Sequence, residues 1–259
     1  MGFCLFNNVA IAASYLLNER TKLGIRRILI VEWDVHHGND TQNMFKVILG
    51  YFIFQYIASS DGSHCMIGED HGVGYNINVP WEHGQCGDAD YLAVWDHILI
   101  PIAEAYNPDI ILISAGFDAA MGDPLGGCCI TPYGYSVMLK RLMKFADGKI
   151  VLALEGGYNL NSLANSVFAC AKTLLEGSPI VGNFEGRPFE STWRLINEVR
   201  NELKTYWSVF SIDLPEEILI ANVERYLIQV IVHALGSTEI YCSCVRPLKM
   251  IQTRVTKIG

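Results

Sequence analysis

The 259-residue sequence lacks the features by which several classes of protein are recognised. No apolar run reaches the ~18 residues that a membrane-spanning helix needs, so we expect no membrane segment. The N-terminus has no basic region of the kind that opens a signal peptide. The eight cysteines form no Cys-x-x-Cys pair, which excludes the usual zinc-finger spacings. We therefore expect a soluble protein with reduced thiols, in the nucleus, the cytoplasm or both.

Charge is also scarce, and basic charge especially so. Asp, Glu, Lys and Arg make up 18% of the residues, and the formal net charge is −8. Direct binding to nucleic acid requires a basic surface, so this balance argues against it. It suits a basic protein partner, such as a Lys- and Arg-rich peptide.

Hydrophobic residues, at 51%, are abundant enough for one large α/β domain. Short apolar runs alternate with stretches of helical periodicity, which predicts a doubly wound parallel sheet flanked by helices. We predict strands at 28–31, 110–114 and 150–154, and helices at 9–19, 88–106, 131–146, 159–176 and 191–207. Asp88 is expected to cap the helix at 88–106 and Pro101 to kink it. The stretch 44–63 has no clear period, and helical spacing returns at 216–235.

Three predicted strands lead directly into polar residues. Asp34 and His36 follow the first strand and, being two residues apart, project to the same side. Asp118 follows the second strand, and Tyr158 follows the third after two glycines. Because the carboxyl ends of parallel strands meet at one edge of the sheet, we expect these side chains to lie together. Two carboxylates and an imidazole leave coordination positions open, as in a catalytic zinc site that activates water and a carbonyl group. The sequence thus predicts metal-assisted hydrolysis.

Each of these residues, taken alone, has a simpler explanation. A lone Asp-x-His pair is more often a capping carboxylate beside a structural histidine, but the Gly-Phe-Asp-Ala segment at a second strand end favours a metal. For Tyr158, spacing does not decide between a donor to a developing oxyanion and an ordinary interface tyrosine. His37 points away from His36 and is predicted to support the site from behind. The remaining histidines are expected on the surface: His64, His71, His83, His97 and His233.

Five segments, in the same order, resemble the zinc-dependent histone deacetylases, in particular class II members and, among these, plant enzymes. The segments are 2–8, 34–39, 114–119, 122–127 and 155–159, which read GFCLFNN, DVHHGN, SAGFDA, GDPLGG and EGGYN. The resemblance extends over about residues 1–45 and 66–207. It implies an arginase-like, doubly wound parallel sheet in a partial catalytic domain, residues 1–210, and leaves 211–259 as a C-terminal extension.

The resemblance also implies a role for each matching residue. Asp34, His36 and Asp118 correspond to the zinc ligands, and Tyr158 corresponds to the tyrosine that polarises the acetyl carbonyl together with Zn²⁺. The residues that correspond to substrate-binding positions around the acetyl-lysine tunnel are Gly2, Phe3, Leu125, Gly156 and Gly157. Backbone oxygens around Glu32, Asp34 and His36 correspond to a structural site for a monovalent cation, K⁺.

The implied activity is zinc-dependent hydrolysis of N6-acetyl-lysine in histones or other proteins, which serves transcriptional repression. The implied partners are acetylated proteins such as histone tails, and corepressor complexes. Small acetylated amines such as polyamines remain open as substrates, because substrate choice depends on the loops around a site.

The sequence departs from the family pattern most strongly at its start. In the family a Gly-His-His motif, which supplies the general base, lies shortly before the Gly-Phe-Cys segment, whereas this sequence begins Met1-Gly2-Phe3-Cys4. We therefore expect an N-terminally truncated sheet. A general base contributes about 10²–10⁴-fold to a rate. The missing motif supports a second hypothesis, that of a catalytically impaired, deacetylase-derived binding or scaffold protein, or a truncated product.

Three further positions depart from the family. Residues 46–60 do not match the strand and loop found there, Glu32 stands where Asp is usual, and Asp40 stands where Gly is usual. A third hypothesis, an arginase-like ureohydrolase with two manganese ions, is disfavoured. That chemistry requires Asp-x-His-x-Asp, and Gly38 occupies the second Asp position.

Overall fold

The computed structural model describes residues 5–48, 51–57, 62–184 and 186–214. The chain divides into two compact units, Met1–Ile212 and Asp213–Gly259, of which the second lies almost entirely outside the described residues. The helix predicted at 216–235 lies there too. The division at residue 210 between a catalytic part and an extension stays a prediction. No helix in the described part of the chain is long and apolar enough to cross a membrane.

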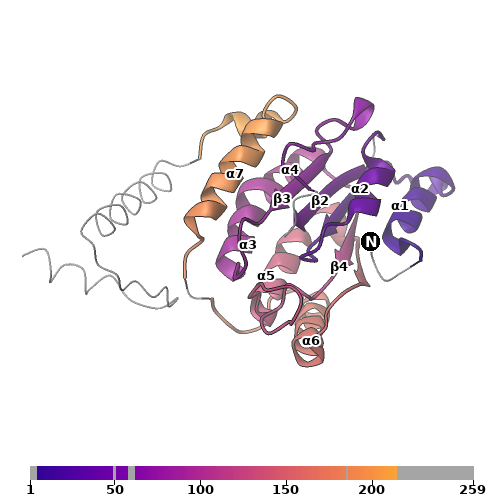
Figure 1. The fold of residues 1–259 in the computed structure, drawn as a ribbon. Helices are drawn as coiled ribbons and strands as arrows, with labels where there is room; N and C mark the ends of the chain where they lie inside the picture. Colours follow the sequence, from indigo (N-terminus) through magenta and orange to yellow (C-terminus); the bar gives the residue numbers. More distant parts are fainter. Residues whose placement is uncertain (1–4, 49–50, 58–61, 185, 215–259) are drawn as a thin grey trace, which may run out of the picture. The chain divides into compact units, whose positions relative to one another are not determined.

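The first unit is built on a parallel sheet of five strands (Figure 1). The strands are β1 Ile28–Glu32, β2 Tyr51–Ile57, β3 Asn76–Pro80, β4 Ile110–Ala115 and β5 Ile150–Leu154. They lie in the order β3-β2-β1-β4-β5, so the chain runs outward from β1 to β3 and then returns to the other side of β1. The strand order therefore reverses between β1 and β4. In such a sheet, ligands bind in the crevice beyond the carboxyl ends of the strands at the reversal.

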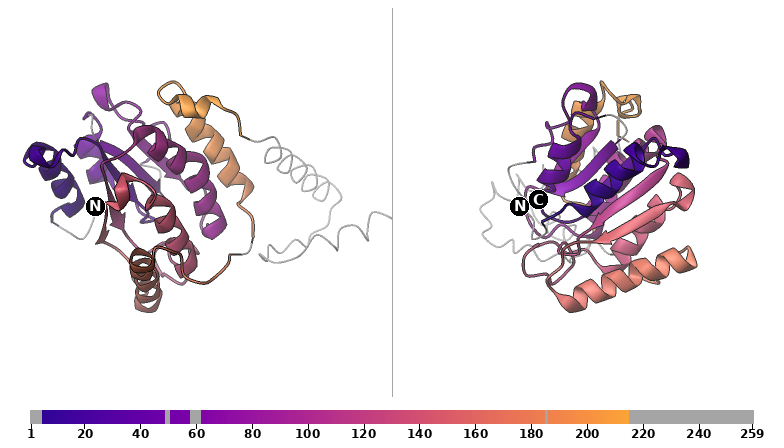
Figure 2. Two further views of the ribbon diagram at one scale, coloured as in Figure 1. Left: turned by 180° about the vertical axis from the view of Figure 1, so that it is seen from behind. Right: turned by 90° about the vertical axis from the view of Figure 1, so that its right-hand side faces the viewer.

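Helices lie on both sides of the sheet (Figure 2). They are α1 Asn8–Asn18, α2 Asn39–Phe45, α3 Asp88–Val94, α4 Ile100–Tyr106, α5 Pro132–Leu142, α6 Leu160–Glu176 and α7 Glu190–Leu203. α1 packs on one face, where Val9 and Ala10 share a buried cluster with Ile30. Leu29 and Val31 alternate with Ile30, point to the opposite face and are also fully buried. Burial on both faces explains why β1 is a continuous apolar run, and it confirms the predicted doubly wound α/β architecture.

Two of the strands, β2 and β3, were not predicted. β2 lies within the stretch 44–63, whose apolar residues show no alternation. β3 alternates, but its Asn76 and Asn78 are both buried. Sequence patterns place asparagine at the surface, so a strand whose buried face is polar escapes them.

The helix predicted at 88–106 is present, with one difference. A π-helical turn, Trp95–Leu99, separates α3 from α4 directly before Pro101. Proline has no N–H to donate to the carbonyl of His97, four residues earlier. That carbonyl accepts instead a 2.9 Å hydrogen bond from Nη1 of Arg200 on α7. The expected kink is thus a widened turn whose free carbonyl is satisfied by another helix.

The cap of this helix also differs from the prediction. Asp90, not Asp88, accepts a 3.1 Å hydrogen bond from the backbone N–H of Gly87, the residue before α3. Asp88 accepts instead from the backbone N–H and the hydroxyl of Thr131, at 2.8 and 2.6 Å. It therefore joins the start of α3 to the start of α5, a contact that no local pattern reveals.

Candidate metal centre

At the reversal point, β1 and β4 are each followed within two residues by an aromatic residue and then a carboxylate. Trp33 and Phe117 come directly before Asp34 and Asp118. The two rings contact the ring of Tyr135 on α5, with centroids 5.5 and 4.9 Å from it. Inclined aromatic contacts of this kind favour one mutual orientation. The aromatic cluster therefore fixes both strand ends from inside the core, and the carboxylates that follow are held at the edge of the sheet.

The structure brings Asp34, His36 and Asp118 together, and their ligand atoms all lie within 4.8 Å of one another. Nδ1 of His36 is 2.7 Å from Oδ2 of Asp118 and 3.1 Å from Oδ1 of Asp34. The Asp118 carboxylate is fully buried and also accepts a 3.1 Å hydrogen bond from the backbone N–H of Val35. The His36 side chain is 56% exposed. The cluster is thus rigid on its inner side and open to solvent at the histidine.

The pKa values of the three cluster side chains differ from their ordinary values. The hydrogen bond to Asp118, and after it the one to Asp34, raises the pKa of His36 to about 10. Burial raises the pKa of Asp34 to about 6. Burial opposes ionisation of Asp118 too, but hydrogen bonds from His36 and Val35 outweigh it and hold the pKa of that carboxyl below its ordinary value. Two carboxylates therefore enclose one positive centre. Their oxygens and the imidazole nitrogen form a donor set that fits a divalent cation such as Zn²⁺.

Glycine is required beside the carboxylates. A Cβ on Gly116 would lie 2.0 Å from Oδ2 of Asp34, and one on Gly156 would lie 2.9 Å from the same oxygen and 3.1 Å from Oδ2 of Asp118. The β5 loop can approach the cluster this closely only without a side chain. Gly156 and Gly157, predicted as substrate-binding positions, thus lie in the loop that borders the candidate metal centre.

Tyr158 is attached to the same loop and is held by its backbone. Its N–H donates a 2.6 Å hydrogen bond to Oδ2 of Asp123, which also accepts from the N–H of Asn159 at 3.1 Å. Oδ1 of Asp123 accepts from the N–H groups of Leu125 and Gly126. Burial, followed by the charges of the two cluster carboxylates, raises the pKa of the Tyr158 phenol. The phenol therefore stays protonated and able to donate a hydrogen bond.

Asp123 lies in the 122–127 segment that resembles the family, but it was not among the predicted site residues. The residue is buried and connects the segment of Leu125 with the segment of Tyr158. An Asp before Pro in a glycine-rich loop is a signal for such backbone bonds, although not for their distant partner. Of the other predicted positions, Gly2 and Phe3 lie outside the described residues.

His37 contacts a buried amide network, and its predicted support of the site stays a prediction. Its Nε2 lies 3.2 Å from Oε1 of Gln42 on α2. The same oxygen accepts hydrogen bonds from the side chains of Asn76 and Asn78 at 3.2 and 2.9 Å. These three amides were also missed, because buried Asn and Gln side chains leave no trace in a hydropathy pattern.

Glu32, the residue where the family usually has Asp, is buried beneath the loop that carries His36. Its carboxylate occupies the space beside Gly38, where a Cβ would lie 1.6 Å from Oε2. Burial raises its pKa to about 7. The K⁺ site predicted at the surrounding backbone oxygens stays a prediction.

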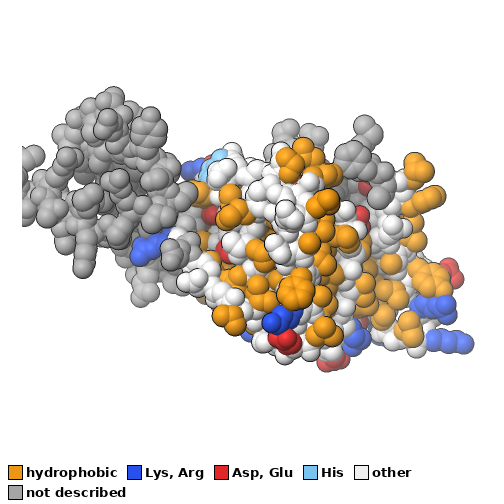
Figure 3. Space-filling view, turned by 90° about the horizontal axis from the view of Figure 1, so that it is seen from below, with side chains coloured by type: hydrophobic (Ala, Val, Ile, Leu, Met, Phe, Trp, Pro, Cys, Tyr) orange, Lys and Arg blue, Asp and Glu red, His pale blue; other side chains and the backbone are white. Residues whose placement is uncertain are grey.

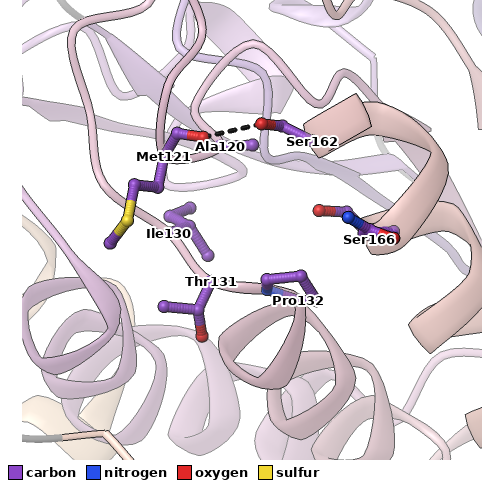
Figure 4. A pocket seen from close by; sticks show the side chains of 8 residues that line it. Ala120, Met121, Ile130, Thr131, Pro132, Ser162 and Ser166 are labelled. Carbon is purple, nitrogen blue, oxygen red and sulfur yellow. Dashed lines mark hydrogen bonds between the residues drawn. The ribbon is translucent and has the colours of Figure 1, made fainter. Parts of the chain in front are cut away.

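A small cavity of about 150 Å³ lies elsewhere, between the 120–132 segment and α6 (Figure 4). Its lining residues are Ala120, Met121, Ile130, Thr131, Pro132, Ser162, Asn165 and Ser166. The Ser162 hydroxyl donates a 2.7 Å hydrogen bond to the carbonyl of Met121 across its rim. None of the cluster residues lines this cavity, so it is separate from the candidate metal centre.

Known proteins share both the sequence and the fold of this chain. The family model described as "Histone deacetylase domain" matches residues 1–174. Histone deacetylase 5 of Arabidopsis thaliana is 61% identical over 228 residues, which are 85% of this chain and 34% of that protein. The chain thus spans about a third of the length of this curated relative.

Two solved structures agree with this result. The structure titled "Crystal Structure of HDA15 HD domain" has a TM-score of 0.72 and 40% identity, and covers 82% of this chain and 58% of its own. The structure of the histone deacetylase Clr3 has a TM-score of 0.76 and 32% identity, and covers 92% of this chain and 43% of its own. The arginase-like fold is confirmed. Because the matched residues include β1, β4, the carboxylate cluster and the loop of Tyr158, the chain belongs to the histone deacetylase family.

Proposed function

We propose that this chain binds Zn²⁺ at Asp34, His36 and Asp118 and hydrolyses N6-acetyl-lysine in proteins. The observation that carries the proposal is the position of these three side chains at the reversal of strand order, with their ligand atoms within 4.8 Å of one another. Three protein ligands leave room for a substrate. Zinc, when bound, supplies a Lewis acid that polarises a carbonyl oxygen and favours the ionisation of water.

The residues around the cluster would position the acetyl group. The open side lies at His36, so the substrate would enter there. The protonated Tyr158 phenol would donate a hydrogen bond to the carbonyl oxygen as negative charge develops on it. Gly156 leaves the space beside the carboxylates free, and the exposed Leu125 would offer an apolar surface to the methylene chain of lysine.

We further propose acetylated histone tails as substrates and corepressor complexes as partners, in the nucleus, the cytoplasm or both. The net charge of −8 supports a basic substrate, because opposite charges steer the two proteins toward each other. A monovalent cation at the backbone oxygens near Glu32 would stabilise that buried carboxylate when it is ionised.

A second candidate function rests on the histidines. The 259 residues contain only one His-His pair, His36-His37. His36 belongs to the cluster and His37 is engaged by Gln42, so neither takes the place of the family's general base. A chain that holds zinc without this base would bind acetyl-lysine but would not hydrolyse it. It would then serve as a binding or scaffold protein.

Acetate release from an acetyl-lysine peptide, measured together with the zinc content of the purified chain, tests both candidates. Asp118→Asn removes one ligand charge. The matched control is Asp147→Asn, whose side chain is 95% exposed. We expect Asp118→Asn to lose one equivalent of zinc and all acetate release, while Asp147→Asn keeps both.

The outcomes separate the candidates. Zinc that depends on Asp118 without acetate release supports the binding protein and contradicts the hydrolase. Equal zinc content in the wild type and Asp118→Asn contradicts both, because both require a metal at this cluster.

A further inference from the structure

A second group of metal-binding side chains lies on the far side of the amide network from the candidate metal centre. His64 and Cys65 belong to the loop that leads toward β3, and Glu202 belongs to the last turn of α7. The Nδ1 or Nε2 nitrogen, the Sγ and a carboxylate oxygen of these residues all lie within 4.8 Å of one another. We call this group the loop–α7 cluster. Sequence reasoning placed His64 on the surface and gave Cys65 no role.

Glu198 lies beside this cluster, next to His64. Its Oε2 lies 4.0 Å from Nδ1 of His64. Glu198 and Glu202 stand four residues apart, so they lie on the same side of α7 and repel each other. Among the described residues, no Lys or Arg forms an ion pair with Glu202, and Arg194, one turn before Glu198, is bonded to Glu82. A cation between the two carboxylates would remove this repulsion.

The loop is held in place from beneath by the buried amides. The side chain of Asn78 donates a 3.1 Å hydrogen bond to the carbonyl of Ser63, and that of Asn76 donates to the carbonyl of Met66. These two bonds fix the backbone on either side of His64 and Cys65. The donors of the loop are therefore preorganised against α7, which is what a metal site requires.

The kinds of donor indicate which metal fits. A thiolate, an imidazole and carboxylates together suit Zn²⁺, which takes four ligands of these types in structural sites. Ca²⁺ and Mg²⁺ require oxygen ligands and do not favour the thiolate and imidazole. The thiol of Cys65 is exposed, so a metal ion can reach it from the solvent.

We propose that His64, Cys65 and Glu202, with Glu198 as the fourth ligand, bind Zn²⁺ as a structural site that clips the loop onto α7. This site contains none of the residues of the candidate metal centre and does not rest on the proposed function. The network of Gln42, Asn76 and Asn78 lies between the two sites, so the clip would also hold the amides that support His37.

Absorption spectroscopy of the full chain with Co²⁺ tests the proposal. A thiolate bound to Co²⁺ gives an intense charge-transfer band in the near ultraviolet. The cluster of Asp34, His36 and Asp118 has no sulfur and cannot contribute to it. We expect the band in the wild type and in Cys129→Ser, a matched control at a partly exposed cysteine outside the loop–α7 cluster. We expect Cys65→Ser to abolish it.

The carboxylate arm uses Glu202→Gln, with Glu104→Gln on the exposed side of α4 as control. Loss of one ligand charge should weaken Co²⁺ binding about 10–100-fold in the first variant and leave it unchanged in the second. No band in the wild type, or a band that persists in Cys65→Ser, overturns the proposal. Equal Co²⁺ affinity in Glu202→Gln and wild type also overturns it.

The melting temperature, Tm, supplies an independent test of the proposed site. Zn²⁺ should raise the Tm of an Asp118→Asn chain, in which the candidate metal centre is disabled. The same ion should leave the Tm unchanged once Cys65→Ser is added. A Zn²⁺-dependent shift of equal size in both chains would contradict a clip made by Cys65.

Discussion

Asp123 holds Tyr158 in place through its backbone, by a 2.6 Å hydrogen bond from the tyrosine N–H to Oδ2 of the aspartate. The same carboxylate accepts from Leu125 and two further N–H groups, so one buried side chain fixes both loops beside the candidate metal centre. The phenol of Tyr158 is thus positioned by a residue 35 positions earlier in the chain.

Asp123→Ala should therefore impair turnover without removing the metal. Displacement of a reacting group by about 1 Å can cost ~10² in rate. We expect kcat for acetate release to fall by about that factor and the free energy of unfolding to fall by about 2–4 kcal/mol, because buried N–H groups lose a charged acceptor. Zinc content should match that of Asp147→Asn. A variant that loses its zinc along with its activity would show that Asp123 acts on the metal centre itself.

Gly156→Ala should weaken metal binding while leaving the fold intact. The new Cβ would press on both cluster carboxylates, at 2.9 and 3.1 Å. We expect zinc affinity, measured by competition with a coloured chelator, to fall about 10–100-fold. Gly87→Ala is the control, since its Cβ would meet its nearest neighbour at an ordinary 3.5 Å. Unchanged affinity in Gly156→Ala would mean that the loop moves aside freely.

Arg200→Ala should be strongly destabilising. Its guanidinium bonds the carbonyl of His97, which Pro101 leaves free, and the carbonyl of Ile212, and it lies over the Phe210 ring with Cζ 5.0 Å from the centroid. Partly buried carbonyls that lose a charged donor cost about 2–4 kcal/mol in the free energy of unfolding, measured by urea denaturation.

Arg194→Ala is the matched control for this variant. Arg194 lies on the same helix but pairs with Glu82 at the surface, where an ion pair contributes less than about 1 kcal/mol. Similar losses in the two variants would contradict the role assigned to the π-helical turn.

Glu32 should make the stability of the metal-free chain depend on pH. Burial raises its pKa from 4.5 to about 7 in the folded state, so the folded chain binds this proton more tightly than the unfolded chain. Stability from this group is therefore present below pH 4.5 and is lost as the pH rises toward 7. The loss amounts to ~3 kcal/mol.

Glu32→Gln should remove this dependence of stability on pH. Urea unfolding with a chelator present, at pH 5 and pH 7.5, should show a smaller fall in stability for the variant than for the wild type. Thr41, which bonds the Glu32 carboxyl, also accepts from Asn7 and can stay in place beside an amide. Parallel pH profiles for the two chains would show that Glu32 keeps an ordinary pKa.

The edge of the sheet at β5 should promote self-association. Within the described residues β5 pairs only with β4, and its Val151 and Leu154 are 51% and 59% exposed. Hydrophobic side chains are also spread over the face drawn in Figure 3. Phe168 on α6 is exposed as well. Exposed apolar edge strands pair with other chains.

Val151→Lys should therefore lower the apparent mass of the chain in light scattering at a given concentration. Val47→Lys, at an exposed position away from β5, should not. An equal effect of both substitutions would indicate that net charge, and not the β5 edge, controls association.

The sequence by itself determined the parts of this protein that depend on local order. Continuous apolar runs marked β1, β4 and β5, and the residues directly after them met at one edge, because parallel strands all end on the same side. The helix predicted at 9–19 is α1, where the Asn7 side chain caps the first turn by accepting a hydrogen bond from the backbone N–H of Ala10. Strand and helix periods act over a few residues, so a single sequence carries them.

Only the tertiary structure decided which residues, far apart in the chain, contact one another. Asp123 reaches Tyr158, Asp88 reaches Thr131, and Arg200 satisfies a carbonyl that Pro101 leaves free. Such partners are set by packing between elements, and their spacing in the chain follows no period. The amides of β3 are the clearest case. Their polarity predicts a position at the surface, whereas the structure buries them. Buried polar groups need hydrogen-bond partners, and the folded chain alone shows that the Asn76 and Asn78 side chains both donate to Gln42.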